Sequence, residues 1–226
     1  MRRDPLELYR PPGMVVGYSF NNASAKDSGP HGLDGTLTGG TITRHYTGTG
    51  SPDEITVTDN AALQITGASV YMFWIMIDAT TQRQNVLCKY NHSSPSSGYA
   101  IRVHNDGTLR FVWRDDNSNY WSGYTSTVLS VDTWYHFALC YPGDGNVPTA
   151  HINGATSAVT PWLVSGDALN GFTSDNGTDL TLGTGQFLGS TLYYLSGSLD
   201  DVRIYDRVLS STEISHIYQG GKQDHS

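Results

Sequence analysis

The 226-residue chain has few charged residues and very few lysines. Charged residues make up 15% of the sequence, against about 25% in an average soluble domain. Lysine occurs only at Lys26, Lys89 and Lys222, and the net charge is -8. Binding to a nucleic-acid backbone needs clustered Lys and Arg, so we expect no nucleic-acid partner.

The sequence also lacks a hydrophobic run that could cross a membrane as a helix. The longest run, VYMFWIMI at 70–77, is far short of the about 20 apolar residues that a membrane helix needs. We interpret it as a strand buried on both faces and expect no membrane insertion. The first twenty residues contain Asp4, Glu7 and several prolines where a secretion signal would have its apolar core. We therefore expect synthesis in a cytoplasm without export.

Only two cysteines are present, Cys88 and Cys140, and both lie in apolar stretches. A thiol in such surroundings behaves as a small hydrophobic side chain, so buried free thiols are our first interpretation. A disulfide is the alternative, because the sequence does not say whether the two Cα atoms come within the about 7 Å that a bridge requires.

Glycine and aromatic residues are abundant, and their spacing predicts an all-β domain. The chain has 25 glycines, and 11% of its residues are aromatic. Short apolar segments alternate with turn clusters about every ten residues, which is typical of a sandwich or barrel. Asp106-Gly107 predicts a hairpin, followed by a strand with Leu109 and Trp113 on one face and Arg110 and Arg114 on the other. We predict strands near 14–20, 41–46, 54–58, 68–77, 85–90, 99–104, 108–114, 133–141, 148–153, 179–183 and 191–205.

One short helix is predicted near the end of the chain. Ser210 and Glu213 form a capping box, Ile214 and Ile217 follow at helical spacing, and Gly220 is placed to end the helix in a left-handed conformation. A chain of this length can bury one sizeable core. We therefore divide the chain into an N-terminal arm at 1–13, one domain at 14–221 and a C-terminal tail at 222–226.

The arm at 1–13 differs from the rest of the chain in its prolines and its charge. Its prolines disfavour a helix. Three arginines against Asp4 and Glu7 give it a charge of +1, which leaves -9 for the remainder. It is either a disordered leader or a segment that becomes ordered on a partner. The candidate docking residues are Arg2, Arg3, Leu6, Leu8, Tyr9 and Arg10.

Several motifs occur in an order that is found in one known family. The segment SGSLDDVRIYDRVLSSTEISHIYQGG spans 196–221, after DTWYHFALCYPG with its Trp-x-His strand and AHINGA with its Asn-Gly hairpin. The early segment GYSFNNASAKDSGPHGLDGTL contains an Asp-Ser-Gly loop. Together, over residues 14–221, these segments resemble the laminin-G-like, concanavalin A-like jelly rolls. The resemblance implies a two-sheet antiparallel jelly-roll sandwich with one short C-terminal helix.

The family includes glycan-binding and protein-binding modules, glycosidases and viral surface proteins, so the resemblance alone does not decide the function. Its glycosidases carry several carboxylates on one strand face, and a retaining pair lies about 5 Å apart. Here Glu7 lies in the arm, Glu213 caps the helix, and Glu54 has threonines on its strand face. We interpret His136 as a core histidine rather than a catalytic base. We therefore expect no catalytic residues and no enzymatic activity.

The paired aspartates of the LDDVRI motif are candidate metal ligands. Asp200 shares a strand face with Val202 and Ile204, so we expect it to point into the sandwich, where an ionised carboxylate needs a partner. The resemblance implies a structural Ca²⁺ between the closing strand and the Asp-Ser-Gly loop at 27–29. The alternative is a buried carboxylate that caps loop amides. The candidate ligands are Asp200, Asp27, Asp34 and Asp201.

The segment RDDNSNYWSGYTS at 114–126 places aromatic rings among planar polar groups. Such rings suit stacking on sugars, and they also suit a protein interface. The alternative is that the rings pack between a loop and a sheet. The candidate ligand-binding residues are Tyr120, Trp121, Tyr124, Arg114, Asp116 and Trp162.

These observations lead to the hypothesis of a non-enzymatic virion-surface protein, a bacteriophage capsid decoration or tail-associated component that binds surface glycans. The arm would dock on a capsid or other virion protein. The opposite charges of arm and body favour a homo-oligomer, although salt would screen that attraction. The main alternative is a secreted carbohydrate-binding module of a larger extracellular protein, and a degenerate glycosidase is the third class.

Overall fold

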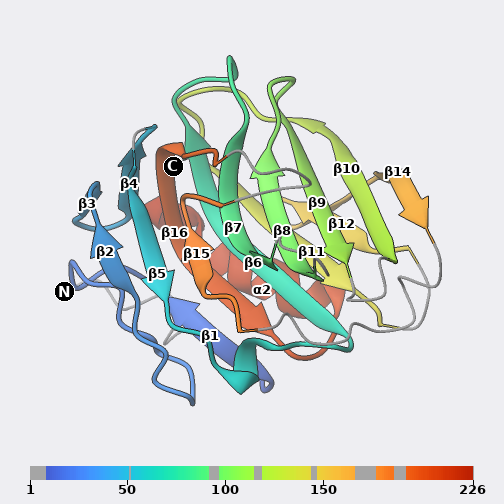
Figure 1. The fold of residues 1–226 in the computed structure, drawn as a ribbon, viewed down its shortest axis with the longest axis horizontal. Helices are drawn as coiled ribbons and strands as arrows, with labels where there is room; N and C mark the ends of the chain where they lie inside the picture. Colours follow the sequence, from blue (N-terminus) through green and yellow to red (C-terminus); the bar gives the residue numbers. More distant parts are fainter. Residues whose placement is uncertain are drawn as a thin grey trace.

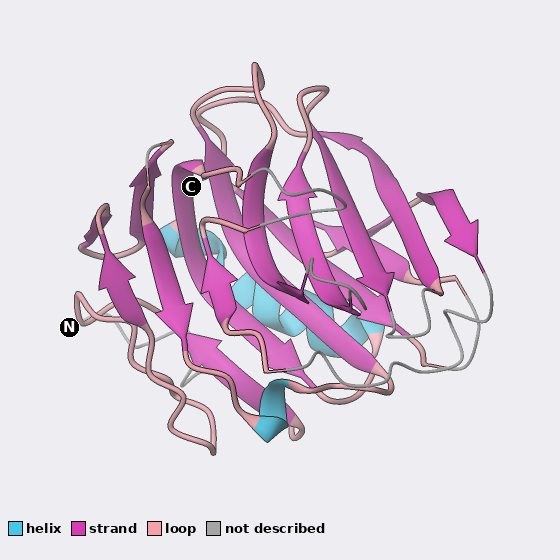
Figure 2. Cartoon of the chain, in the orientation of Figure 1, coloured by secondary structure: helices cyan, strands magenta, loops and turns pink. Residues whose placement is uncertain are grey.

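The structure is a computed structural model that describes residues 9–50, 52–91, 97–114, 119–143, 147–165, 177–185 and 192–225. Within these residues two antiparallel sheets of eight strands each are stacked face to face, and one helix covers the outside of one sheet (Figures 1 and 2). The predicted jelly-roll sandwich is therefore confirmed.

The first sheet, sheet A, contains the closing strand of the chain. Its members are β1 (Met14–Tyr18), β3 (Thr41–Ile42), β4 (Tyr46–Thr49), β6 (Ser69–Ile77), β11 (Tyr135–Tyr141), β12 (Thr149–Ile152), β13 (Ala155–Ser157) and β16 (Ser196–Tyr205). They are ordered β13-β12-β11-β6-β16-β4-β3. Strand β1 pairs with the second half of β16 on the edge whose first half pairs with β4.

The second sheet, sheet B, faces sheet A across the core. Its members are β2 (Thr36–Thr38), β5 (Glu54–Val57), β7 (Gln84–Asn91), β8 (Ser97–Val103), β9 (Thr108–Arg114), β10 (Tyr120–Val128), β14 (Val159–Ser165) and β15 (Leu180–Leu182). They are ordered β14-β10-β9-β8-β7-β15-β5-β2. A short 3₁₀ helix, η1 (Ala61–Leu63), lies between β5 and β6. The predicted hairpin at Asp106-Gly107 joins β8 to β9, and Gly107 has a φ of 77°.

The core between the sheets is rich in aromatic rings. Phe111 and Trp113 of β9 and Trp121 of β10 are at most 1% exposed. Trp113 reaches Tyr71 of the opposite sheet, with ring centroids 6.2 Å apart. Burial of such large apolar surfaces is the main force that holds the two sheets together.

The sequence pattern does not predict β10 or β14, and it offers Trp121 either as a ligand-binding residue or as a ring packed between a loop and a sheet. The first interpretation is wrong, because the Trp121 ring lies in the core and stacks on Phe111 with centroids 5.6 Å apart at 15°. A Cβ atom at Gly123 would lie 2.6 Å from the Trp121 ring, so the glycine makes room for the tryptophan. The glycine and the serines around it hide the alternation by which β10 could have been recognised.

The helix α2 (Ser211–Gly221) packs on the outer face of sheet A. Its capping box is present as predicted, since Ser210 accepts from the Glu213 backbone and Glu213 reaches back to Ser210. Ile214 and Ile217 join an apolar cluster with residues of β6 and β11. Both Cys140, in this cluster, and Cys88, in sheet B, are buried free thiols, which confirms the first interpretation.

The predicted end of the helix is wrong. Gly220 is helical, and the chain continues through Gly221 into a 3₁₀ turn, η2 (Lys222–Asp224). The continuation brings His225 back onto sheet A, so a tertiary contact decides where the helix ends rather than the local glycine signal. No helix among the described residues is long and apolar enough to cross a membrane.

The end of the N-terminal arm packs on the domain itself. The Tyr9 ring lies 5.4 Å from the ring of His216 on α2, and the Tyr9 carbonyl accepts a hydrogen bond of 3.2 Å from Arg203. Arg10 is exposed. Of the candidate docking residues, Tyr9 therefore already has contacts within this chain. The other candidates lie outside the described residues: Arg2, Arg3, Leu6 and Leu8.

Replacement of the two tryptophans of the neighbouring strands β10 and β14 should change the stability to very different extents. Trp121→Ala should lower the free energy of unfolding by about 3–5 kcal/mol, because it leaves a cavity in the core. Trp162→Ala, on the surface, should change it by less than about 1 kcal/mol. Urea denaturation of both variants measures this, and equal effects would contradict the core position of Trp121.

Candidate functional site

The closing strand β16 contains a β-bulge at its paired aspartates. Asp200 is opposite Trp74 and Arg203 is opposite Met72, so β16 has one residue more than β6 between these two pairs. Asp201, at the bulge, has a φ of 48°. An extra residue in one strand inverts the alternation of faces beyond it.

The bulge places Asp200 on the outer face of sheet A. Leu199 before the bulge and Val202 after it both face the core, whereas Asp200 and its partner Trp74 lie on the side covered by the C-terminal residues. The prediction that Asp200 points into the sandwich is therefore wrong, because regular alternation through the motif was assumed. Asp200 is nevertheless buried, with 7% of its surface exposed.

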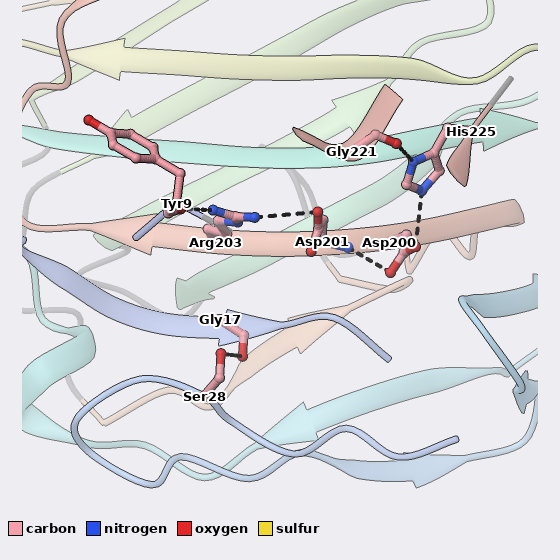
Figure 3. Close-up of polar contacts among 8 residues, drawn as sticks. All are labelled: Tyr9, Gly17, Ser28, Asp200, Asp201, Arg203, Gly221 and His225. Atoms are coloured by element: carbon pink, nitrogen blue, oxygen red, sulfur yellow. Dashed lines mark hydrogen bonds and ion pairs between the residues drawn. The ribbon is translucent and has the colours of Figure 1, made fainter. Parts of the chain in front are cut away.

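The partner of Asp200 is His225, near the end of the chain (Figure 3). Asp200 Oδ2 lies 3.0 Å from His225 Nε2, and Asp200 Oδ1 accepts from the backbone of Asp201 at 2.8 Å. His225 Nδ1 lies 2.8 Å from the carbonyl oxygen of Gly221. The imidazole also stacks on Trp74, with centroids 4.2 Å apart at 7°. We name this arrangement the C-terminal latch, meaning Asp200, His225 and Trp74.

The latch needs a proton between Asp200 and His225. The Gly221 oxygen can only accept, so His225 Nδ1 is the donor in that contact, and Nε2 then accepts from Asp200 Oδ2. Burial, with a contribution from Asp201, raises the pKa of Asp200 to about 7. Asp200 therefore donates to His225 below about neutral pH, and above that pH its ionised carboxylate can no longer do so.

Asp201 and Arg203 form a second buried pair beside the latch. Asp201 Oδ2 lies 3.4 Å from Arg203 Nη2, and Arg203 donates to the Tyr9 carbonyl (Figure 3). Both side chains are at most 3% exposed. The two adjacent aspartates thus have different basic partners, and each partner ties a terminal segment of the chain to β16.

The Asp-Ser-Gly loop is attached to β1, next to β16. Asp27 accepts from the backbone amides of Gly17 at 2.9 Å, Gly29 at 2.6 Å and Leu33 at 2.8 Å. Ser28 donates to the Gly17 carbonyl at 2.9 Å (Figure 3). Both oxygens of Asp27 therefore accept from backbone amides of β1 and of this loop. The predicted alternative to calcium, a buried carboxylate that caps loop amides, concerned Asp200, which instead contacts His225 and the backbone of Asp201.

The four candidate calcium ligands are not brought together as one ligand set. Asp34 binds Lys26 and the backbone of Asp27, and the other three have the partners described above. No group of three or more His, Cys, Asp or Glu among the described residues could hold a metal ion. The arrangement does not fit a calcium ion that needs six to eight oxygens, so Ca²⁺ stays a prediction without support from these contacts.

A small pocket of about 100 Å³ opens beside the latch. Among the described residues its lining offers no activated nucleophile, and both ring nitrogens of His225 already face oxygen atoms. His136, beneath α2, is a core histidine: burial lowers its pKa to about 3, so it is neutral. The pocket is lined by Asn21, Arg44, His45, Trp134, Asp200, Asp224 and His225.

On the outer face of sheet B, polar and aromatic side chains form one row across five strands. Consecutive residues of the row are opposite each other in the strand register. Leu109, Phe111 and Trp113 of β9 face the core, so Arg110 between them faces outward. We name this set the polar row: Asn85, Arg102, Arg110, Tyr124 and Thr160.

Two aromatic rings flank Arg110 at the end of the polar row. Its guanidinium carbon lies 5.6 Å from the Tyr124 ring centroid and 5.0 Å from that of Trp162. Trp162 is 45% exposed. It occupies a bulge, since Gly123 is opposite Pro161 and Ser122 is opposite Leu163. A bulge re-aims a side chain, and here it brings an edge-strand tryptophan over the sheet face.

The orientation of Arg110 is fixed by Asp106 in the preceding turn. Arg110 Nη2 lies 2.7 Å from Asp106 Oδ2, and Asp106 Oδ1 accepts from the backbone of Thr108 at 2.9 Å. Partial burial raises the pKa of Asp106, but the hydrogen bonds from Thr108 and the contact with Arg110 outweigh this and lower it. Asp106 is therefore ionised and holds the guanidinium in place beneath the rings.

Five of the six candidate ligand-binding residues are described, and they lie in three places. Tyr124 and Trp162 come together around Arg110, which the sequence analysis placed on the correct face but did not select. Tyr120 and Arg114 are opposite each other on the same outer face. Trp121 is in the core, and Asp116 lies outside the described residues. The missing signal for Arg110 was the register that places it beside Tyr124.

The family model described as the concanavalin A-like lectin/glucanases superfamily matches residues 49–215. A search of curated protein sequences gave no significant match.

Among solved structures, the binding domain of paraclostridial mosquitocidal protein 1 is 16% identical with a TM-score of 0.68, over 91% of this chain and 52% of that one. The ligand-binding domain of botulinum neurotoxin serotype D, in complex with N-acetylneuraminic acid, is 20% identical with a TM-score of 0.68, over 92% and 51%. A structure of botulinum neurotoxin type C, a toxin whose cell entry depends on interaction with two ganglioside molecules, is 13% identical with a TM-score of 0.64. The match covers 92% of this chain and 51% of that one. The chain spans about half the length of these proteins, and the similarity establishes a shared fold.

The latch predicts a loss of stability as the pH rises toward 7. The pKa of Asp200 is raised from 3.8 to about 7 in the folded state, so its contribution to stability is fully present below about pH 4 and is lost by about pH 7. In Asp200→Asn the side-chain amide does not titrate. The melting temperature of the wild type should therefore fall relative to that of Asp200→Asn between about pH 4 and about pH 7, and the two curves should run parallel above that range. Parallel curves between about pH 4 and about pH 7 would rule out the raised pKa of Asp200.

Proposed function

We propose a carbohydrate-binding function, from the premise that the chain belongs to the concanavalin A-like lectin/glucanases superfamily, whose model matches residues 49–215. The observation that carries the proposal is the cluster of Arg110, Tyr124 and Trp162 on the outer face of sheet B. A half-exposed indole beside a fixed guanidinium offers an apolar face for a sugar ring and donors for its hydroxyl groups. The solved structures with sialic acid or ganglioside partners support this class of ligand.

The binding is proposed to be non-catalytic. Glycoside hydrolysis needs two carboxyl groups that flank the scissile bond. On the outer face of sheet B, Asp106 is the acidic residue in contact with the cluster, and it is bound to Arg110 and Thr108. On the other sheet, Asp200 and Asp201 are held by His225 and Arg203. In the described part of the chain, each of these carboxylates thus has a structural partner.

The virion setting is a separate and finer proposal. We propose that the chain is a component of a virion surface and that the N-terminal arm at 1–13 docks it on a capsid or other virion protein, or on a second copy of the chain. The +1 arm and the -9 remainder support attraction between copies at low salt. An extracellular module of a larger protein is the alternative setting. The glycan-binding proposal is independent of this choice.

Deletion of residues 1–8 combined with Arg10→Gln tests the docking role of the arm, because it removes all three arginines of the arm and leaves the packed Tyr9 in place. The full chain should form oligomers at low salt that dissociate at high salt, whereas the shortened chain should be monomeric in both. Size-exclusion chromatography with light scattering measures this. Identical masses for the two chains would remove the proposal of self-association through the arm.

Trp162→Ala tests the carbohydrate site. Loss of the indole should weaken glycan binding at least about tenfold, because it removes both the stacking surface and one wall around Arg110. Val164→Ala is the matched control, since Val164 lies on the same strand and is 54% exposed. A glycan array followed by calorimetry on the best ligand measures both variants. Unchanged affinity in Trp162→Ala would place the site elsewhere.

A further inference from the structure

The ring of His225 lies in a cage of two tryptophans and one carboxyl group. It stacks on Trp74 with centroids 4.2 Å apart at 7°, and the Trp134 ring meets it edge-on at 4.8 Å and 72°. Asp200 Oδ2 lies 3.0 Å from its Nε2 atom. We name Trp74, Trp134 and Asp200 the latch cage. An aromatic face, an aromatic edge and a hydrogen-bonding group surround one imidazole, so the cage suits a histidine side chain.

The latch cage is built by elements other than the segment that fills it. Trp74 is on β6, and Asp200 is opposite it on β16. Trp134, just before β11, also packs against His45 with ring centroids 5.4 Å apart. The ring that fills the cage comes from residues 222–225, which follow α2. The site and its occupant are therefore separate parts of the chain.

The segment that carries His225 is joined to α2 at a weak point, Gly220. Gly220 is helical, and a Cβ atom there would meet nothing within 4 Å. A Cβ at Gly221, in contrast, would lie 2.6 Å from Trp74 Nε1, so packing requires glycine only at that position. Glycine makes a helix less stable than alanine does, because its backbone has more freedom in the unfolded state. Gly220 thus weakens the last turn of α2 without a packing need, which favours detachment of residues 222–225.

The closed cage is reachable from outside and contains an unsatisfied donor. The pocket of about 100 Å³ beside the latch is lined by Trp134, Asp200 and His225, so a second ring could approach the cage through it. Trp74 Nε1 is buried and has no hydrogen-bond partner among the described residues. A buried donor without an acceptor costs free energy, and access to water relieves that cost. Both features favour opening of the cage.

We infer that the latch cage is a recognition site for a histidine side chain of a polypeptide, and that His225 is its intramolecular occupant, which detaches about Gly220. The partner that fits is the C-terminal segment of a second copy, since it would repeat the contacts seen within one chain (Figure 3). The chain's own segment competes at a high effective concentration and keeps the cage closed. Crowding of copies at one place favours exchange between them.

His225→Ala in the full chain empties the cage and leaves its walls unchanged. The probe is 4-methylimidazole, which reproduces the histidine side chain. Near saturation it should raise the melting temperature of this variant by about 2–4 °C and leave the wild type unchanged. 1-Methylimidazole should have a smaller effect, because it cannot make both hydrogen bonds of His225. His216→Ala is the matched control, since that ring contacts Tyr9 outside the cage, and it should gain nothing.

A synthetic peptide of residues 221–226 tests the second copy as partner. It should bind His225→Ala at least about tenfold more tightly than it binds the wild type, whose own segment competes for the cage. The peptide with His225→Ala should bind about tenfold more weakly than the natural peptide. Tryptophan fluorescence measures this, because two of the three cage residues are Trp74 and Trp134. Equal binding of the two peptides would overturn the inference, as would no response of His225→Ala to 4-methylimidazole.

Gly220→Ala tests the hinge in a chain whose latch is intact, so its result does not depend on the folding of His225→Ala. Backbone amides of residues 222–225 should exchange with solvent deuterium about fivefold more slowly than in the wild type, because alanine favours the closed helical turn. Gly67→Ala is the control, since a Cβ atom at Gly67 also meets nothing within 4 Å. Unchanged exchange in Gly220→Ala would overturn the detachable segment. Glycan binding on sheet B is independent of each of these outcomes.

Discussion

The bulge in β16 is the constraint on which the arrangement of the termini depends. It inverts the faces of the closing strand, so that Leu199 and Val202 both reach the core while Asp200 and Asp201 remain on the outer side of sheet A. Two carboxylates there would be costly if they lacked partners, because burial disfavours their ionised forms. His225 from the C-terminal end and Arg203, which also holds the Tyr9 carbonyl, supply those partners. The acidic pair thereby joins both ends of the described chain to the middle of one sheet.

The outer faces of the two sheets are built differently. The outer face of sheet A is covered by α2 and the residues after it, and its polar groups bind to one another. The outer face of sheet B has no such helix among the described residues, and it carries the polar row beside a half-exposed tryptophan. Both outer surfaces use a β-bulge to re-aim a side chain that regular alternation would place elsewhere. The sandwich provides the scaffold, and the two bulges change which side chains its outer faces present.

Much of the fold could be predicted from the sequence, because its signals are local. The Asp106-Gly107 turn, the apolar run of β6 and the Ser210 capping box all depend on residues a few positions apart. The failures involve distant partners. The ring of Trp121 fits the core only because Gly123 makes room for it, and no local pattern indicates that. Asp200 was recognised as buried, but its partner is 25 residues away beyond a helix that was expected to stop earlier. The cluster around Arg110 could not be predicted, because it depends on the register of β9, β10 and β14, which is set only when the sheet is formed.

The edges of the two sheets have a consequence for how copies of this molecule can meet. In the described sheets, β2 and β13 have three residues each and β3 has two, so these borders offer few free amide groups. The longer border, β14, contains Pro161, which has no N–H to donate, next to the bulge at Trp162. At the borders β2, β3, β13 and β14 a neighbouring strand would therefore find no long regular ladder to extend, and at the edge of β1 the Asp-Ser-Gly loop already binds the Gly17 backbone. Contact between molecules is directed to side-chain surfaces, which protects a β-rich chain from stacking into fibres at high local concentration.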